Sequence, residues 1–494
     1  MITKTDPDEF RDYLKDASNM PGGHAERLLV PSDEDELRAI LREAGETGVP
    51  VTISGARTGT VGGAIPFGGI LVSLEKLLKL EIDKDASSAV VGAGVILGDF
   101  RREAEALGLF YPPDPTEWSC QIGGNIATDA SGARSFKYGS TRDFVESIRV
   151  VLADGDLLVL SRGEVTAEDG RFALRTESGR EIEVPAPTYP TPDVSKDCSG
   201  YFSAPAMDAV DLFVGSEGTL GVITEAGLRL LPKPEGSITG IVFFRNRADL
   251  LGFVDEVRRL SMGESHSGNR IDASFVEYFD SNSLRFIREK YPETPKRMAG
   301  AVYFEQETGA DSEDQVYGLW NDLLESSNAS IDESWFAVGD ADLEKMREFR
   351  HALPVAVNEK IVKFGQKKVS TDMAIPVENF ESFLRFSETL LENSGIEHVV
   401  FGHMGDCHLH ANMIPADDEQ AVSAKHIYGR MIAQSIMLGG TVSAEHGIGK
   451  LKSRYLYVMY GERYIHEMVA IKKALDPKSI LGRGNVFEEK FLNA

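Results

Sequence analysis

Apolar residues near the start of the chain follow the spacing of one helix face. Four of them recur three or four residues apart: Leu37, Ile40, Leu41 and Ala44. This period predicts an amphipathic helix with Ser32 as its N-cap. The apolar run 51–53 then predicts a short strand, and it leads into residues 54–64, where four of eleven residues are glycine. We therefore expect a strand followed by a glycine-rich loop.

The same alternation of strand, loop and helix continues further along the chain. A second glycine-rich segment, 123–132, comes after an amphipathic helical pattern over 97–107. Two apolar runs, 148–152 and 157–160, flank an Asp-Gly turn at 154–155 and predict a β-hairpin.

Pro232 and Pro234 mark a domain boundary, because they close a strand-like stretch. Beyond them, strand-like runs at 241–244, 301–304 and 398–402 mix with helical runs at 248–260, 315–324 and 377–391. This mixture predicts an antiparallel sheet covered by helices on one face. We expect a first domain over 1–234, a second over 235–440, and a helical C-terminal segment over 441–494 that returns to the first.

The net charge of the chain restricts its possible binding partners. The chain has 494 residues and a formal net charge of -26, which repels nucleic-acid phosphates and anionic headgroups. We expect no nucleic-acid partner, and an anionic substrate would need Arg, Lys, His or metal charge close by. The three cysteines are Cys120, Cys198 and Cys407, and because they contain no C-x-x-C pair, we expect neither disulfides nor a cysteine-ligated iron–sulfur cluster.

The distribution of apolar segments indicates where in the cell the protein is located. The N-terminal residues are acidic where a signal peptide would need an apolar stretch, and no apolar run reaches the roughly 18 residues of a membrane-spanning helix. We expect no transmembrane segment and a cytoplasmic protein. Any contact with the inner membrane is expected to be peripheral and to run through a partner.

Two glycine-rich loops in one domain favour a ligand that contains a pyrophosphate, because glycine lets backbone N–H groups approach phosphate oxygens. Tight turns without a ligand are the alternative for either loop taken alone. Residues 447–450 lack the first glycine of a Walker loop, and 92–98 imitates a dinucleotide fingerprint but is one residue too long. A nicotinamide-dependent dehydrogenase that uses 92–98 stays open as an alternative.

Histidines and acidic residues gather in two stretches of the last third, 403–410 and 443–450. His408 and His410 alternate on an expected strand and so share a face, with His403 across a turn. Imidazole and carboxylate ligands suit zinc or a similar divalent ion. A polar strand end with exposed histidines is the alternative.

Six segments occur in an order that resembles the FAD-binding domain of the vanillyl-alcohol-oxidase-type flavoproteins: 54–64, 112–115, 120–128, 137–143, 151–155 and 214–224. The chain resembles a subgroup with D-lactate dehydrogenases, glycolate oxidase flavin subunits and D-2-hydroxyglutarate dehydrogenases. This resemblance implies an α+β fold with a two-part FAD-binding domain, a substrate or cap domain with an antiparallel sheet, and a C-terminal segment that completes the active site.

The resemblance also implies how FAD is held. The first loop would bind the pyrophosphate, and the second would lie along the cofactor toward the flavin. Covalently flavinylated relatives attach the ring to a histidine of the first loop; here that loop has none, so FAD is expected to be non-covalent. The expected cofactor-binding residues are Ser54, Gly55, Ala56, Arg57, Thr58, Gly59, Thr60, Gly63, Pro113, Cys120, Gly123, Gly124, Asn125, Ala127, Gly132, Tyr138, Glu217, Gly218, Gly221 and Ile223.

The family's metal ligands and catalytic base match four positions of the last third. By this resemblance, His403, His410 and Glu445 would bind the divalent ion. His446 would act as the base.

The family's carboxylate clamp, an arginine and a lysine, matches Arg350 and Lys367, although Lys368 stays open as the lysine. A guanidinium binds a carboxylate at two points.

Two departures from the family remain open. Cys407-His408 replaces a common Gly-Asn pair, and His408 could add a ligand, contact substrate or fill space. At the C-terminal end, 481–487 replaces an Asn-Pro-Gly-Lys motif, which leaves the flavin contact of that asparagine undecided.

The residues and the resemblance together predict FAD-dependent oxidation of a D-2-hydroxy carboxylate to the 2-oxo acid, with hydride transfer to flavin N5. The substrate would be D-lactate-like, glycolate or D-2-hydroxyglutarate. Electrons would leave to a quinone, a cytochrome, an electron-transfer flavoprotein or oxygen. The rival is a redox-neutral alkyl-transfer synthase, against which Glu445 argues, since such relatives carry a histidine-rich replacement there. A homodimer or a complex with a redox partner is compatible with the sequence.

Overall fold

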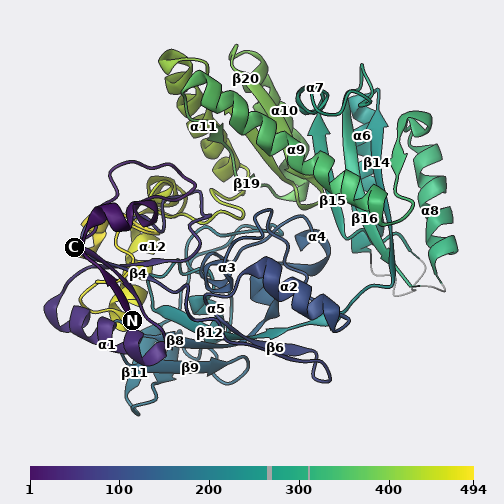
Figure 1. The fold of residues 1–494 in the computed structure, drawn as a ribbon. Coiled ribbons are helices and arrows are strands. Elements are labelled where there is room, and N and C mark those ends of the chain that lie inside the picture. The colour runs from purple at the N-terminus through teal and green to yellow at the C-terminus, as the bar shows by residue number, and fades with distance from the viewer. Residues whose placement is uncertain (264–269, 310–311, 494) are drawn as a thin grey trace.

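Two sheets organise the first part of the chain (Figure 1). The structure is a computed structural model and describes residues 1–263, 270–309 and 312–493. The smaller sheet has the order β1-β2-β4-β3 and consists of β1 (Ile2–Lys4), β2 (Arg27–Val30), β3 (Val51–Ser54) and β4 (Ile70–Ser73). The larger sheet has the order β5-β6-β12-β8-β9, with antiparallel neighbours throughout, and consists of β5 (Leu80–Asp83), β6 (Ser88–Gly92), β8 (Val145–Val151), β9 (Leu157–Ser161) and β12 (Val222–Arg229).

Short elements complete this part: the helices α1 (Glu34–Thr47), α2 (Leu97–Ala106), α3 (Ile122–Thr128), α4 (Ser135–Tyr138) and α5 (Ala209–Phe213), and the strand pairs β7 (Leu109–Phe110) with β13 (Leu231–Pro232) and β10 (Arg171–Arg175) with β11 (Glu181–Pro185). Helices α1 and α2 confirm the two amphipathic patterns, and β8 with β9 confirms the hairpin.

The predicted N-cap of the first helix was wrong by one residue. Helix α1 buries the four apolar residues expected, but Asp33 is its N-cap and accepts a hydrogen bond from the N–H of Glu36. The hydroxyl of Ser32 accepts instead from the N-terminal ammonium of Met1 at 3.1 Å. Both side chains are good N-caps, so the sequence pattern alone does not separate neighbouring candidates.

The glycines of 92–98 serve close backbone packing. A Cβ on Gly92 would lie 2.3 Å from the carbonyl oxygen of Leu77, and one on Gly94 would lie 2.4 Å from that of Leu74. The strand before them, β6, is antiparallel to both of its neighbours and is therefore no part of a parallel βαβ unit. The dinucleotide-fingerprint alternative loses its structural basis.

An eight-stranded sheet forms the second part, shown in teal and green in Figure 1. Its pairs are all antiparallel, as predicted, in the order β17-β14-β16-β15-β20-β21-β18 with β19 beside β21. The strands are β14 (Gly236–Phe244), β15 (Phe275–Asp280), β16 (Gly300–Thr308), β17 (Trp335–Phe336), β18 (Val369–Ser370), β19 (Met373–Ala374), β20 (Glu397–His403) and β21 (His408–Ile414).

Helices cover both faces of this sheet, whereas one covered face was expected. Val242 and Phe244 share a core with α6 (Arg247–Met262), α8 (Glu313–Ser326), α10 (Val377–Glu392) and α11 (Asp418–Met437). Ile241 and Phe243 face the other way, toward α7 (Ser281–Ile287) and α9 (Asp340–Phe364). Helix α9 was not among the expected helices, and it continues through Pro354, a residue that normally disfavours a helix.

The C-terminal segment, yellow in Figure 1, returns to the first part beside the N-terminal elements. After α12 (Ser453–Leu475), the N–H of Val51 donates to Ile480 O and the N–H of Gly482 donates to Val51 O, at 2.8 and 3.0 Å. The predicted boundaries at 234 and 440 fall between elements, before β14 and after α11. No helix of the described residues is long and apolar enough to cross a membrane.

Candidate active site

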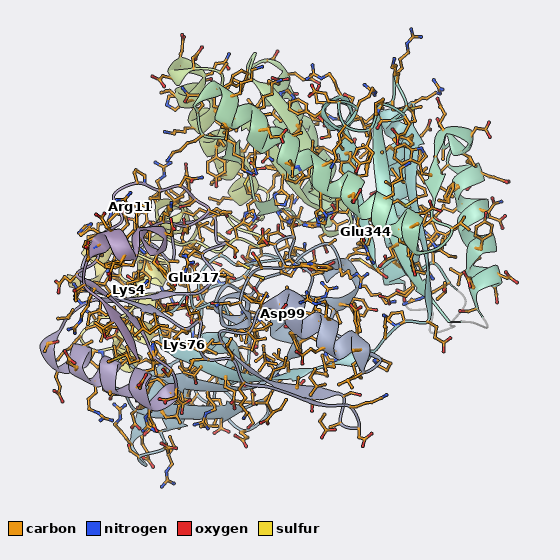
Figure 2. The ribbon with its side chains drawn as sticks, in the orientation of Figure 1. Lys4, Arg11, Lys76, Asp99, Glu217 and Glu344 are labelled. Carbon is orange, nitrogen blue, oxygen red and sulfur yellow. The ribbon has the colours of Figure 1, made fainter. Side chains whose placement is uncertain are left out.

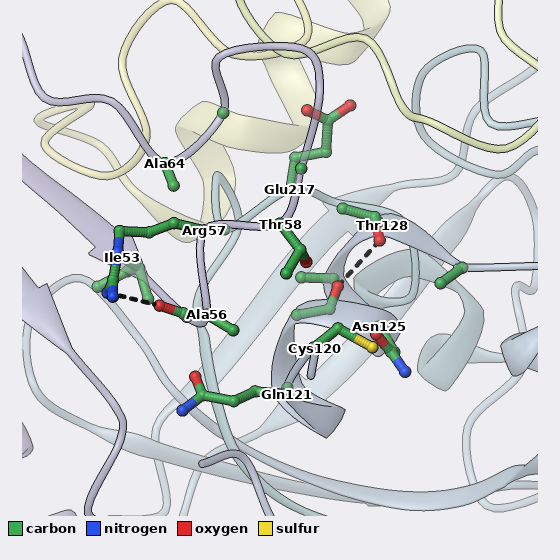
Figure 3. A pocket seen from close by; sticks show the side chains of 18 of the residues that line it. Ile53, Ala56, Arg57, Thr58, Ala64, Cys120, Gln121, Asn125, Thr128 and Glu217 are labelled. Carbon is green, nitrogen blue, oxygen red and sulfur yellow. Dashed lines mark hydrogen bonds between the residues drawn. The ribbon is translucent and has the colours of Figure 1, made fainter. Parts of the chain in front are cut away.

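The two glycine-rich loops face each other across a cavity in the first part (Figure 3). Figure 3 shows Arg57 and Thr58 of the first loop opposite Cys120 and Asn125 near the second. Sixteen of the expected cofactor-binding residues line the cavity: Gly55, Ala56, Arg57, Thr58, Gly59, Thr60, Gly63, Cys120, Gly123, Gly124, Asn125, Ala127, Glu217, Gly218, Gly221 and Ile223.

The cavity has features of a binding cradle that the protein itself does not fill. A Cβ on Gly59 or Gly124 would meet no protein atom within 4 Å, so both glycines leave room on the cavity side. The N–H groups of Ala56 to Thr60 donate to no acceptor among the described residues. Arg57 adopts a left-handed φ of 62°, which is uncommon outside glycine and typical of functional loops. Free N–H groups on such a loop suit phosphate oxygens.

Four expected residues lie outside the lining of the cavity. Ser54 is buried and its hydroxyl donates to Gly55 O. A Cβ on Gly132 would lie 1.9 Å from Asp114 O, so this glycine permits two backbones to pack closely. The Tyr138 hydroxyl donates to Glu307 of β16, which joins the two parts of the chain. Pro113 also lies outside the lining.

Asn485 is the last residue of the stretch 482–485 that replaces the family's Asn-Pro-Gly-Lys motif. It lines the cavity, and its Nδ2 donates to Gly63 O at 3.0 Å and to Glu217 O at 3.1 Å. Asn485 thus connects the C-terminal segment to the first loop, while Gly482 stands where the family motif has its asparagine. Asp16 also lines the cavity, and the sequence pattern gave no signal for it. Gln121 lines the cavity too; it lies in the segment 120–128 but was not among the expected cofactor-binding residues.

Glu217 is an internal carboxylate that ties the cavity to the C-terminal segment (Figure 2). It accepts hydrogen bonds from the N–H groups of Ile448 and Gly449 at 2.6 and 2.7 Å. Burial raises the pKa of Glu217, against the opposite effect of these two donors. Since Gly447 and its neighbours follow Glu445 and His446 directly, this contact fixes the segment that carries the predicted metal ligand and the predicted base.

Four imidazoles surround the carboxylate of Glu445, and we call these five residues the histidine–glutamate cluster. The nitrogen nearest to Glu445 lies at 3.1 Å for His410, 3.3 Å for His403, 3.6 Å for His446 and 3.8 Å for His408. The strands bring them together: His403 ends β20, and His408 and His410 share one face of β21 after a single 3-10 turn. Glu445 and His446 also line the cavity.

The second nitrogen of His403 and of His410 is held from outside the cluster. His403 Nδ1 lies 2.5 Å from Glu277, and His410 Nδ1 donates to Thr371 O at 3.1 Å. This leaves the Nε2 atoms of both rings directed at Glu445. Carboxylates and carbonyls hold metal-binding histidines in this way.

Asp372 holds the other two imidazoles. Its oxygens lie 3.1 Å from His408 Nε2 and 3.1 Å from His446 Nδ1, and Lys452 donates to it at 2.6 Å. Burial opposes the charge on Asp372, but His446 and Lys452 outweigh it and hold the pKa of the carboxyl well below its usual range. Asp372 therefore stays ionised and fixes both rings.

The buried charges around the cluster favour an additional cation. Four buried carboxylates, of Glu277, Asp372, Asp406 and Glu445, meet three cationic side chains, of Lys196, Arg350 and Lys452. Burial and Lys196 lower the pKa of His403, but Glu277 and Glu445 outweigh them and raise it to about 9. Burial lowers the pKa of His408 to about 3, so that imidazole is neutral. Protonated His403 supplies the fourth positive charge, and a divalent ion among these nitrogens and Glu445 would take the place of that proton.

Arg350, on α9, lies beside both the cluster and the cavity. Its Nε donates to Glu277 at 3.1 Å, and its Nη1 donates to Thr116, which lines the cavity, at 3.4 Å. Among the described residues, its Nη2 has no hydrogen-bond partner. Lys367 lies elsewhere: its side chain is exposed and donates to the backbone oxygen of Asn19. The structure therefore brings Arg350, and not Lys367, to the site.

Comparisons with known proteins agree with this geometry. Residues 25–161 match the family model of an FAD binding domain, and residues 250–486 match that of the C-terminal domain of FAD linked oxidases. A D-lactate dehydrogenase of Anaerostipes hadrus is 30% identical, and the match covers 96% of this chain and 92% of the relative. The chain belongs to the FAD-linked oxidase family.

Members of this FAD-linked oxidase family include the glycolate oxidase subunit GlcD of Bacillus subtilis, 29% identical over 99% of this chain and 96% of the relative. Among solved structures, p-cresol methylhydroxylase with bound substrate has a TM-score of 0.70 at 16% identity, over 100% of this chain and 94% of that one. The predicted vanillyl-alcohol-oxidase-type fold is thereby confirmed. The protein is an FAD-linked oxidoreductase.

FAD binding to the cavity gives a direct prediction. Gly124→Leu fills the space opposite the first loop, so the purified variant should lack the yellow flavin that wild-type protein carries. Gly252→Leu is the control, because Gly252 is exposed on α6 and its Cβ would also meet nothing. Absorbance at the flavin bands checks both.

Acid precipitation of the wild type should release all flavin into the supernatant, and yellow pellets would contradict non-covalent binding.

Proposed function

We propose that the protein oxidises a D-2-hydroxy carboxylate, of the D-lactate type, or glycolate or D-2-hydroxyglutarate, to the 2-oxo acid. The observation that carries this proposal is that Glu445 and His446 line the same cavity as the glycine-rich loops. The loops expected to bind the flavin and the histidine expected to accept the proton thus line one cavity. The names of the two relatives, a D-lactate dehydrogenase and a glycolate oxidase subunit, support this substrate class.

FAD, non-covalently bound in the cavity, supplies the acceptor for the hydride from C2. His403, His410 and Glu445 would hold a divalent ion, zinc or a similar metal. That ion supplies Lewis acidity, which lowers the pKa of the substrate hydroxyl.

His446 takes the hydroxyl proton. Its Nδ1 faces Asp372, so its Nε2 is the nitrogen left to accept a proton, and the imidazolium that forms is stabilised by the same carboxylate. About a third of its side chain is exposed (31%), unlike the buried His403, His408 and His410, so substrate can reach it.

Arg350 holds the substrate carboxylate. Glu277 engages only the Nε side of the guanidinium, which leaves Nη2 for the substrate and orients the planar group. The clamp also meets the need for local positive charge in a chain of net charge -26.

Arg350→Lys should lower kcat/KM by about ten- to a hundredfold, because one ammonium cannot contact both Glu277 and substrate in the same plane. Steady-state kinetics measure the loss. Arg347→Lys is the matched control, since Arg347 is exposed on the same helix and pairs only with Glu344 across one turn. An Arg350→Lys enzyme with unchanged kinetics would show that other residues bind the substrate carboxylate.

Electrons must leave the reduced flavin to an external acceptor: a quinone, a cytochrome, an electron-transfer flavoprotein or oxygen. Among the described residues, the groups of side chains that could hold a metal ion contain no cysteine. A redox-neutral alkyl transfer on the same fold does not need a metal ion, so the histidine–glutamate cluster argues against that alternative.

Anaerobic bleaching of the flavin tests the function. We expect one or more D-2-hydroxy acids to reduce the flavin, and their L-enantiomers to leave it oxidised. The panel should include D-lactate, glycolate and D-2-hydroxyglutarate with L-lactate as the control. A flavin that no 2-hydroxy acid bleaches would overturn the proposal.

A further inference from the structure

One imidazole of the cluster has no role in the function proposed above. His408 is the first residue of β21 and is fully buried, at 0% exposure. Its Nδ1 lies 3.8 Å from Glu445 Oε2, on the same side as the rings of His403 and His410.

We infer that His408 is a further ligand of the metal, so that three imidazoles and one carboxylate hold the ion. This inference rests on the metal site of the proposed function. One nitrogen or oxygen from each of His403, His408, His410 and Glu445 lies within 4.8 Å of all the others. Metal–nitrogen bonds of about 2.0–2.1 Å place ligand atoms roughly 3–4 Å apart, so small side-chain shifts close the set around one ion.

The hydrogen bonding of His408 supports a ligand and argues against mere space filling. Among the described residues, Nδ1 has no hydrogen-bond partner and Nε2 has only the poorly aligned contact with Asp372, although the ring is completely buried. Buried polar atoms without partners are rare in folded proteins and indicate an ion or a function. An apolar side chain would fill the same space without this cost.

Asp372 orients His408 for metal binding. With Nε2 3.1 Å from Asp372 Oδ1, the proton belongs on Nε2, and the lone pair of Nδ1 is directed at Glu445. The same carboxylate faces the Nδ1 of His446. Asp372 therefore connects a metal ligand with the catalytic base.

A third imidazole changes which ions the site prefers. Nitrogen-rich sets favour zinc, cobalt, nickel and copper, whereas oxygen-rich sets suit magnesium, calcium and manganese. The relatives that resemble this chain commonly have asparagine at the position of His408. We expect this chain to prefer zinc over manganese more strongly because of that one histidine.

Metal affinity measured without turnover tests the inference. Metal-stripped, FAD-containing protein is titrated with Zn²⁺, and separately with Mn²⁺, against a chromophoric chelator. His408→Asn should weaken zinc binding by about tenfold or more, change manganese binding much less, and retain FAD. His398→Asn is the matched control, because His398 lies on β20 and contacts Asn282 and Ile396 outside the cluster. Equal zinc affinity and zinc-to-manganese preference in His408→Asn and wild type would overturn the inference.

X-ray absorption at the zinc edge of wild-type protein provides a second measurement that needs no variant. Three coordinated imidazoles support the inference, and two overturn it while leaving the proposed function intact. A wild type that binds no metal at all removes the metal from the proposed function as well, and this result differs from a two-imidazole site.

Discussion

Replacing His446 with asparagine will leave FAD and metal bound while slowing reduction of the flavin by substrate by about a hundred- to ten-thousandfold. The asparagine has no group that accepts the hydroxyl proton at neutral pH. His403, His410 and Glu445 are untouched by the change, and Asp372 keeps Lys452 as its counterion. Anaerobic stopped-flow absorbance measures the rate of bleaching, and elemental analysis measures the metal.

The control for this variant is His426→Asn, at an exposed position of α11. It should reduce its flavin at the wild-type rate. A His446→Asn enzyme that is bleached at the same rate as the control would show that another group accepts the proton.

Glu445→Gln should fail in a different way, although the two residues are neighbours. The amide keeps the size of the side chain but removes the negative charge that the four imidazoles and Lys196 surround. We expect metal affinity to fall by at least about a hundredfold and turnover to fall with it, while FAD stays bound. Excess zinc should restore part of the rate, because added ion offsets weaker binding.

Glu462→Gln is the matched control, since Glu462 is exposed on α12. Metal content and flavin reduction should match the wild type. A Glu445→Gln protein that keeps its metal would assign the carboxylate another role, such as positioning Lys196. A wild type that is fully active without metal would leave the histidines to bind substrate directly.

Local patterns predicted the parts of the structure that depend on neighbouring residues. The face of α1, the hairpin of β8 and β9, and the shared face of His408 and His410 follow from periods of two and of 3.6 residues. The glycine-rich loops were recognisable because their composition is unusual over a short stretch. Gly132 shows the limit of such composition arguments. Its lack of a side chain lets two backbones pack closely at Asp114, and the sequence alone does not distinguish this role from contact with a ligand.

The residues that surround the cluster could not be predicted, because they come from distant segments. Lys196, Glu277 and Asp372 are single charged residues in ordinary surroundings, and no local period indicates that they meet. Their charge did not indicate a buried position near the cluster, because most charged residues of a protein are exposed at its surface. Lys367 shows the reverse: by resemblance it belonged to the clamp, yet the fold turns it toward Asn19.

Helix α9 was not among the helices expected from the sequence, and it contains a residue that disfavours helices. Pro354 removes one backbone donor and normally disfavours the preceding turn, so a sequence argument ends a helix there. The helix nevertheless buries Phe349 and Leu353 just before the proline and Val357 after it, and this contact with the sheet outweighs the local preference.

The parallel bridge of Val51 with residues 480–482 connects positions more than four hundred residues apart. During synthesis, the glycine-rich loops leave the ribosome long before Glu445, His446 and Asn485, which line the same cavity. The nascent chain therefore carries an incomplete cofactor cradle for most of its translation. Contacts of such long sequence separation form late and slowly. FAD capture should accordingly follow docking of the C-terminal segment and be among the last folding events.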